Sequence, residues 1–216
     1  MRLFSRNMAA AMVGAVAFVA LSTASHAGTV TTIFSTGVND SGETLGLGDT
    51  DTHYSGGSTT VYSNPAFLPN DPAGTAGGSA FLGADNVGAV TNYVVHFTLA
   101  SVHDAVLAGA WATDNVGLDI LVNGHSTGIS LIDHTVDAFN QLHTFSQNLG
   151  ISFFQVGENT LTFVIGNDDP GLIGAFRAAN LTVTTTPIPP SILMFLTALG
   201  GLGFTAYRRR RGSAAA

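Results

Sequence analysis

Short apolar runs separated by turn-forming residues constrain this chain more than any other feature, because they leave little room for helices. Gly, Ser, Thr, Asn and Asp interrupt the apolar runs throughout residues 28–186. From Tyr93 to Leu99 the odd-numbered positions are apolar, whereas His96 and Thr98 fall between them. Alternation with a period of two is typical of a half-buried strand. We therefore expect strands over residues 29–35, 92–99, 105–112, 117–122, 160–165 and 178–184.

The turns between these runs indicate how the strands are joined. The run 116–122 leads into Asn123-Gly124, a pair that favours the two-residue turn of a hairpin. Residues 40–80 are rich in Gly, Pro and Ser and predict long loops around one or two short strands. Short strands at turn-limited spacing favour antiparallel sandwiches. We predict an all-β fold over residues 28–186, an antiparallel jelly-roll β-sandwich of a size that one core can support.

Charge is strongly segregated along the chain. All 14 Asp and Glu residues lie between Asp40 and Asp169, and Arg177 is the one basic Lys or Arg residue within 28–186. That segment therefore carries a formal charge of −13, although the whole chain carries −7. Such a surface repels nucleic acid and favours solubility, divalent cations, neutral glycans or basic partners. The chain has no cysteine, which excludes disulfides and thiolate chemistry.

The N-terminus has the layout of a secretory signal peptide. Arg2 and Arg6 precede an uncharged apolar stretch over residues 8–21, and Ser25-His26-Ala27 fits the rule of small residues before a cleavage site. The stretch is short for a membrane span of about 20 residues, which favours cleavage over a retained anchor. We predict a signal peptide over residues 1–27, cleaved between Ala27 and Gly28.

The C-terminus combines prolines, an apolar segment and a basic cluster. Pro187-Ile188-Pro189-Pro190 precedes the uncharged residues 191–207, four arginines follow at Arg208, Arg209, Arg210 and Arg211, and residues 212–216 form a short tail. Proline suits the first turn of a helix, so we expect a helix near Ser191 that is barely long enough to span a membrane. The arginines favour the cytoplasmic side, which places residues 28–186 outside.

This three-part tail, residues 187–211, resembles the PEP-CTERM sorting signal. The resemblance implies that an exosortase, a membrane transpeptidase, recognises the tail and cleaves near Pro187, Ile188 and Pro189. Ile188 stands where the usual motif has an acidic residue. The implied destination is the cell surface or extracellular matrix of a Gram-negative bacterium, after temporary anchoring in the membrane by the C-terminal helix.

Several segments of the central domain resemble galactose-binding-like jelly rolls. They are residues 34–38, 51–54, 111–115, 121–124 and 154–163, which occur in the order seen in that family. The resemblance implies a jelly-roll fold and a glycan partner, such as the exopolysaccharide of the same cell. It predicts no catalytic residues.

Five residues are candidates for contact with a sugar. Trp111, the sole tryptophan, and Tyr54 have rings that can stack on a sugar, although neighbouring alanines favour a core position for Trp111. Asp114, Asn115 and Asn123 can hydrogen-bond hydroxyl groups, although they also suit turns.

Asp49, Asp51 and His53 have the best local spacing for metal ligands. In an extended segment, alternate side chains point the same way, so two carboxylates and an imidazole could hold a divalent ion such as Ca²⁺. The alternative is an acidic loop exposed to solvent.

Residues 124–128, Gly-His-Ser-Thr-Gly, match the serine nucleophile elbow of hydrolases. That mechanism needs a helix after the serine, whereas the residues that follow Ser126 favour another strand. We interpret the match as a hairpin.

The leading hypothesis is a non-enzymatic, carbohydrate-binding surface protein. The alternatives are a structural coat or adhesion protein without a sugar site, stabilised by calcium, and, remotely, a secreted serine hydrolase.

Overall fold

The computed structural model describes residues 28–84, 88–132, 137–168 and 171–186, together with Leu199. The predicted signal peptide up to Ala27 and the predicted sorting motif, Pro187 to Arg211 apart from Leu199, lie outside the described residues. Within the described part of the chain, no helix is both long and apolar enough to cross a bilayer.

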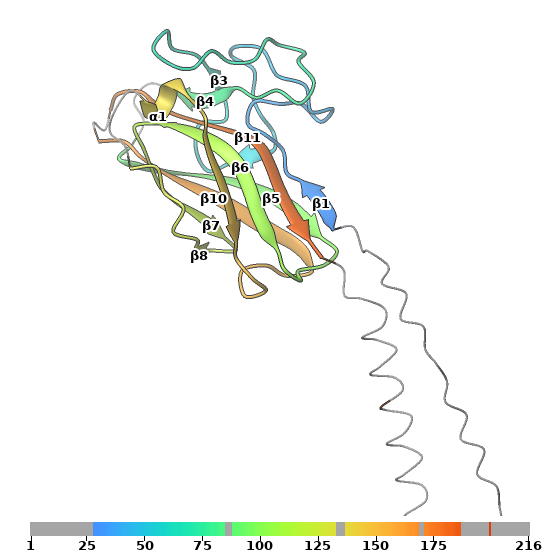
Figure 1. The fold of residues 1–216 in the computed structure, drawn as a ribbon. Coiled ribbons are helices and arrows are strands. Elements are labelled where there is room, and N and C mark those ends of the chain that lie inside the picture. The colour runs from blue at the N-terminus through green and yellow to red at the C-terminus, as the bar shows by residue number, and fades with distance from the viewer. Residues whose placement is uncertain (1–27, 85–87, 133–136, 169–170, 187–198, 200–216) are drawn as a thin grey trace, which may run out of the picture. The chain divides into compact units, whose positions relative to one another are not determined.

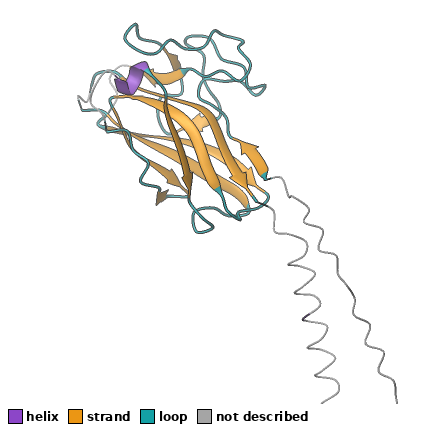
Figure 2. Ribbon diagram, viewed as in Figure 1, coloured by secondary structure: helices purple, strands orange, loops and turns teal. Residues whose placement is uncertain are grey.

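The described residues form two antiparallel sheets with a single short helix (Figures 1 and 2). The first sheet has the order β3-β4-β11-β6-β9, and β1 also pairs with β11; the second has the order β2-β5-β10-β7-β8. The first sheet's strands are β1 (Thr29–Thr32), β3 (Val61–Tyr62), β4 (Phe81–Ala84), β6 (Val106–Asp114), β9 (His143–Asn148) and β11 (Gly174–Thr185). The second's are β2 (Tyr54–Ser55), β5 (Val90–Leu99), β7 (Val116–Val122), β8 (His125–Ser126) and β10 (Gly157–Gly166). The all-β prediction is confirmed.

All six predicted strands are present, most of them longer than the sequence pattern indicated. In β5 the side chains of Tyr93, Val95, Phe97 and Leu99 are buried and the residues between them are more exposed, as the alternation predicts. β5 pairs with β10 along its whole length, from Leu99 opposite Gly157 to Val90 opposite Gly166. The loops predicted within 40–80 contain two short strands, β2 and β3, and much of this segment lies at one end of the sandwich (Figure 1).

Three elements were not predicted: β4, β9 and the helix α1 (Asp137–Asn140). β9 pairs with β6 and forms an edge of the first sheet. Its burial alternates between partly buried and exposed residues, so neither face of this edge strand is fully buried. Its sequence therefore carries no clear apolar alternation.

Aromatic rings fill the space between the sheets. The Phe163 ring centroid lies 4.6 Å from that of Phe176 and 5.8 Å from that of Trp111, and Tyr93 packs on Phe176 at 5.0 Å. The Trp111 indole lies directly against Gly117, where a Cβ atom would fall 2.6 Å from the indole carbon Cζ3. Burial raises the pKa of Tyr93 to about 12. This part of the fold is a closed core.

The predicted hairpin at Asn123-Gly124 is confirmed. Both residues have positive φ, 50° and 80°, as a type I′ turn requires, and β7 pairs with β8 across the turn. Ser126 is exposed within β8, and no helix begins in the residues up to Ile132. The serine therefore lies in a surface hairpin and lacks the strand–turn–helix setting of a nucleophile elbow.

Arg177 fastens the long loops to the first sheet. Its guanidinium donates to the Ser79 hydroxyl, the Pro69 carbonyl and the Asp71 carboxylate, each at 2.8 Å. The side chain is 3% exposed and lies over the Phe81 ring. In the sequence this residue stands out only by its charge; its contacts in the structure show that it organises the fold.

Candidate functional site

The two aromatic residues predicted to stack on a sugar lie in the core. Trp111 is 2% exposed and Tyr54 is 4% exposed. The Tyr54 hydroxyl donates to the Phe34 carbonyl at 2.8 Å, and burial, aided by Asp51, raises the pKa of Tyr54 well above its usual value. Sheet packing covers both rings, so the prediction that they contact a ligand is corrected: they hold the fold.

The side chain of Asn123 is hydrogen-bonded within the protein. Its side-chain nitrogen donates to the Phe153 carbonyl at 2.9 Å and to Asn159 Oδ1 at 2.8 Å. Its side-chain oxygen accepts from the Thr160 N–H at 2.9 Å. Because these bonds join the hairpin to the start of β10, Asn123 has a structural role in place of the predicted ligand contact.

The structure does not gather Asp49, Asp51 and His53 into a set of metal ligands. The Asp49 carboxylate accepts from the Gly46 N–H at 2.8 Å and closes a local turn. The buried Asp51 carboxylate accepts from the Gly37 N–H at 2.7 Å and lies 3.1 Å from Nδ1 of His53. No cluster of three or more His, Cys, Asp or Glu side chains suited to a metal occurs among the residues that the structure describes.

His53 instead joins two carboxylates to an aromatic ring. Its ring stacks on Phe34 with centroids 3.6 Å apart. Its Nε2 atom is buried and lies 3.2 Å from Asp40 Oδ1, although the contact does not meet the geometry of a hydrogen bond. Through Asp51 and Asp40, this group ties together the loop segments around residues 34–53.

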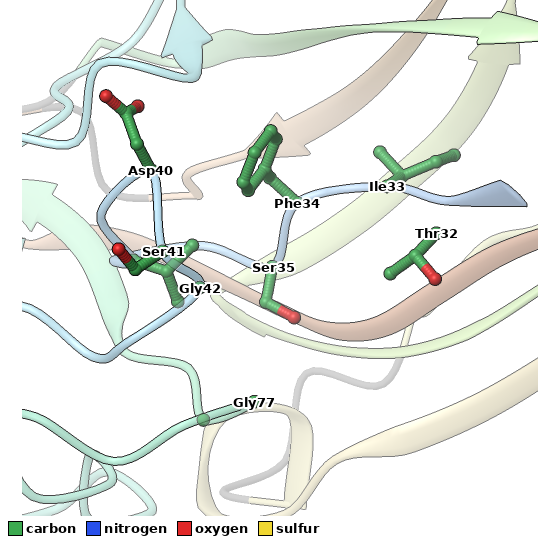
Figure 3. Close-up of a pocket in the computed structure, with 10 residues that line it drawn as sticks. Thr32, Ile33, Phe34, Ser35, Asp40, Ser41, Gly42 and Gly77 are labelled. Carbon is green, nitrogen blue, oxygen red and sulfur yellow. The ribbon is translucent and has the colours of Figure 1, made fainter.

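A shallow hollow of about 270 Å³ lies beside this group (Figure 3). Phe34, Ile33 and Val38 line it together with the backbone of several glycines, and Asp40 is its one charged lining residue. The Asp40 carboxylate is 95% exposed to water and is already near His53. Thr32, Ser35 and Ser41 add hydroxyl groups to the lining, and Ser35 Oγ already accepts from the Asn180 N–H at 3.3 Å.

A second pocket, of about 240 Å³, contains two of the predicted ligand residues. Asp114 and Asn115 line it together with Asn167, Leu172 and Ile173. Strand pairing brings these segments to one end of the sandwich, because Asp114 at the end of β6 pairs with Ala175 near the start of β11. Val116 at the start of β7 pairs with Gly166 at the end of β10, just before Asn167.

The pocket combines polar groups of opposite hydrogen-bonding character. The Asp114 residue is 8% exposed, and no described residue donates a hydrogen bond to its carboxylate. Asn115 Oδ1 accepts from the Asp168 N–H at 3.3 Å, whereas no described group accepts from its side-chain nitrogen. Leu172 is 57% exposed and adds an apolar surface beside them. A buried acceptor and an amide donor are thus both available to a ligand.

The Asp114 carboxylate is held in a poorly solvated place. Burial disfavours its charged form and raises the pKa of Asp114 to about 6. The same carboxyl group in an unfolded chain titrates near pH 4. An unpaired, partly desolvated carboxylate lining a pocket costs stability, and such groups cluster at functional sites.

We expect Asp114→Asn to stabilise the protein at neutral pH. Between about pH 4 and pH 6 the folded protein holds a proton that the unfolded chain releases, so stability falls as pH rises through this range. Removing the charge should raise the free energy of unfolding by about 1–3 kcal/mol at pH 7 and by little at pH 4. Urea denaturation at both pH values measures this. Equal effects of the substitution at the two pH values would contradict it.

Comparison with known proteins adds little to this geometry. No protein-family model and no curated protein match the chain. One similar solved structure is a family 35 carbohydrate-binding module from an environmental isolate, 19% identical, with a TM-score of 0.34, over 61% of this chain and 98% of that module.

Sequence reasoning missed Asn167, Leu172 and Ile173. They belong to the turn between β10 and β11, where the sequence showed only turn chemistry. The available signal was the apolar pair Leu172-Ile173, which follows Asp and Gly residues just after a strand. Its pocket partners, Asp114 and Asn115, lie more than fifty positions earlier in the chain, so the sequence pattern does not connect them.

Proposed function

We propose that this protein is exported and sorted by an exosortase-type system, and that its sandwich domain is a non-enzymatic carbohydrate-binding module at the cell surface or in the extracellular matrix. The order β4-β11-β6-β9 in one sheet and β5-β10-β7-β8 in the other supports a jelly-roll topology, in which eight strands form two facing sheets. Folds of this kind host many functions, so the pocket carries the functional part of the proposal.

The single observation that carries the proposal of carbohydrate binding is that Asp114 and Asn115 line the same pocket. A sugar hydroxyl both donates and accepts hydrogen bonds, and the two side chains offer one acceptor and one donor. Leu172 supplies an exposed aliphatic surface for the C–H face of a sugar ring. Apolar walls with a few placed polar groups are the general character of ligand sites.

The size of the pocket limits what it can hold. At about 240 Å³ it lies just below the range of about 300–1,000 Å³ of pockets that enclose drug-sized ligands. A volume of this size suits one sugar unit, at the end of a chain or on a branch, better than a longer stretch. We therefore propose recognition of a terminal or side-chain residue of a microbial polysaccharide.

Leu172→Ala should weaken glycan binding without harming the fold. Loss of this apolar surface should raise the dissociation constant by about three- to tenfold, which calorimetry on the full-length protein and a glycan identified by array screening would measure. Val156→Ala is the matched control, because Val156 is 67% exposed and precedes the opposite end of β10. Equal weakening by both substitutions would contradict the site. Silence across microbial polysaccharides would contradict carbohydrate binding and favour a structural coat protein.

The sorting half of the proposal rests on the sequence of the two termini. An epitope tag placed after Ala216 should be lost from the mature surface protein if an exosortase removes the tail. Persistence of the tag would show a permanent anchor.

A further inference from the structure

Within the part of the chain that the structure describes, no cation pairs with the Asp114 carboxylate. Arg177 is the one Lys or Arg residue between positions 28 and 186, and its guanidinium is committed to Asp71, Ser79 and Pro69. His53, His96 and His103 each lie against another carboxylate. Asp168, beside Asn115, adds a second acidic residue next to the pocket. Asp114 therefore lies in an acidic setting, which favours a cationic group on a ligand over a neutral or anionic one.

The negative charge of the pocket determines which sugars should bind most favourably. A uronic acid or a sulfated sugar would bring a second negative charge close to a partly desolvated carboxylate, which is unfavourable. A neutral sugar would donate an ordinary hydrogen bond. A sugar with a free amino group would form a charge-assisted hydrogen bond, which is shorter and about twice as strong as a neutral one.

We propose that this pocket selects sugars that carry a free amine, such as glucosamine units, over N-acetylated and anionic sugars. Asp114 binds the ammonium group, and the side-chain nitrogen of Asn115 donates to a neighbouring hydroxyl oxygen. Leu172 packs against the ring. This selection rests on the carbohydrate-binding function proposed above and specifies the chemistry of the ligand.

The titration of Asp114 supports this assignment. With a pKa raised by burial to about 6, the carboxyl group is mostly ionised at pH 7 and mostly protonated at pH 5. An ammonium group favours the ionised form, so it relieves the cost of burying the charge, whereas an N-acetyl group does not. The preference for the amine should therefore weaken as pH falls from 7 to 5.

The experiment compares two oligosaccharides that differ in the acetyl group. Calorimetry on the full-length protein at pH 7 and moderate salt would use the glucosamine pentamer, the N-acetylglucosamine pentamer and pentalysine. We expect the glucosamine pentamer to bind about tenfold more tightly than the acetylated pentamer and than pentalysine. The ratio of the two sugar affinities should fall toward one in Asp114→Asn, and in the unaltered protein at pH 5.

Asp104→Asn is the matched control. It removes the same charge from an exposed residue that precedes β6, at the opposite end of that strand from Asp114. The affinity ratio should stay at about tenfold in this variant, because general attraction to an acidic surface changes equally in both variants.

Four outcomes would overturn the inference, and they separate it from the proposed function. An affinity ratio that persists in Asp114→Asn would show general surface attraction. Pentalysine binding that is equally tight and lost in Asp114→Asn would show recognition of amines without sugar. Equal affinity for the two pentamers would refute amine selection while carbohydrate binding stands. Absence of binding to both pentamers and to every arrayed polysaccharide would refute the proposed function itself.

Discussion

Replacing Arg177 by methionine should lower the free energy of unfolding by about 3–4 kcal/mol. The substitution leaves the Asp71 carboxylate without its counter-ion and removes the donors to the Ser79 hydroxyl and the Pro69 carbonyl. Breaking a buried ion pair by removing one partner costs about 3–5 kcal/mol, and partial exposure of Asp71 places this case toward the lower end. Guanidinium denaturation of the two proteins would measure the difference.

Asp71→Asn is the matched variant for this prediction. Asn keeps an oxygen that can accept from Arg177 and from the Ser79 N–H, which Asp71 binds at 2.8 Å. Its cost should be about 1–2 kcal/mol, well below that of Arg177→Met. Hydrogen exchange should show the loss in the loops between β3 and β4, because these contacts fasten them to the sheet. An Arg177→Met protein as stable as the parent would contradict the proposed role in stability.

Replacing Trp111 by alanine should cost about 3–5 kcal/mol of stability. The indole is 2% exposed, packs on Phe163 and lies against Gly117, so its removal leaves a large cavity between the sheets. Gly117→Ala tests the same contact from the other side. The added methyl group would overlap the indole, and overpacking should cost about 1–3 kcal/mol.

Leu118→Ala serves as the control for both substitutions. Leu118 follows Gly117 in β7 but is 42% exposed, so its truncation should cost less than about 1 kcal/mol. Thermal denaturation and glycan binding should be measured together on the folded variants. A Trp111→Ala protein with unchanged stability but without glycan binding would contradict the core role of Trp111. It would indicate that this ring stacks on the sugar.

Much of the fold could be predicted because strands and turns depend on local pattern. The alternation in β5 and the positive φ of Asn123 and Gly124 follow from pleat geometry and from turn sterics, which involve only neighbouring residues. β9 was missed because an edge strand needs no clear apolar alternation. β4 was missed because Phe81 and Leu82 are both buried, so the strand shows no period of two.

The candidate site was predicted in part. Asp114 and Asn115 were selected for their hydrogen-bonding groups, and they line a pocket. Trp111, Tyr54 and Asn123 were selected by the same reasoning and lie in the core or in a turn. Residue type alone cannot separate these cases, because exposure is set by which strands face each other and not by the side chain.

The sequence by itself determined the all-β class, the positions of the long strands and the Asn123-Gly124 hairpin, since these depend on interactions among residues close in the chain. The tertiary structure decided that Trp111 packs against Gly117, that Arg177 binds Asp71, and that Asp114 shares a pocket with Leu172. Pairs such as Asp114 and Ala175 lie far apart in the chain. Pairing between distant strands, and the burial that it causes, therefore separates structural residues from those available to a ligand.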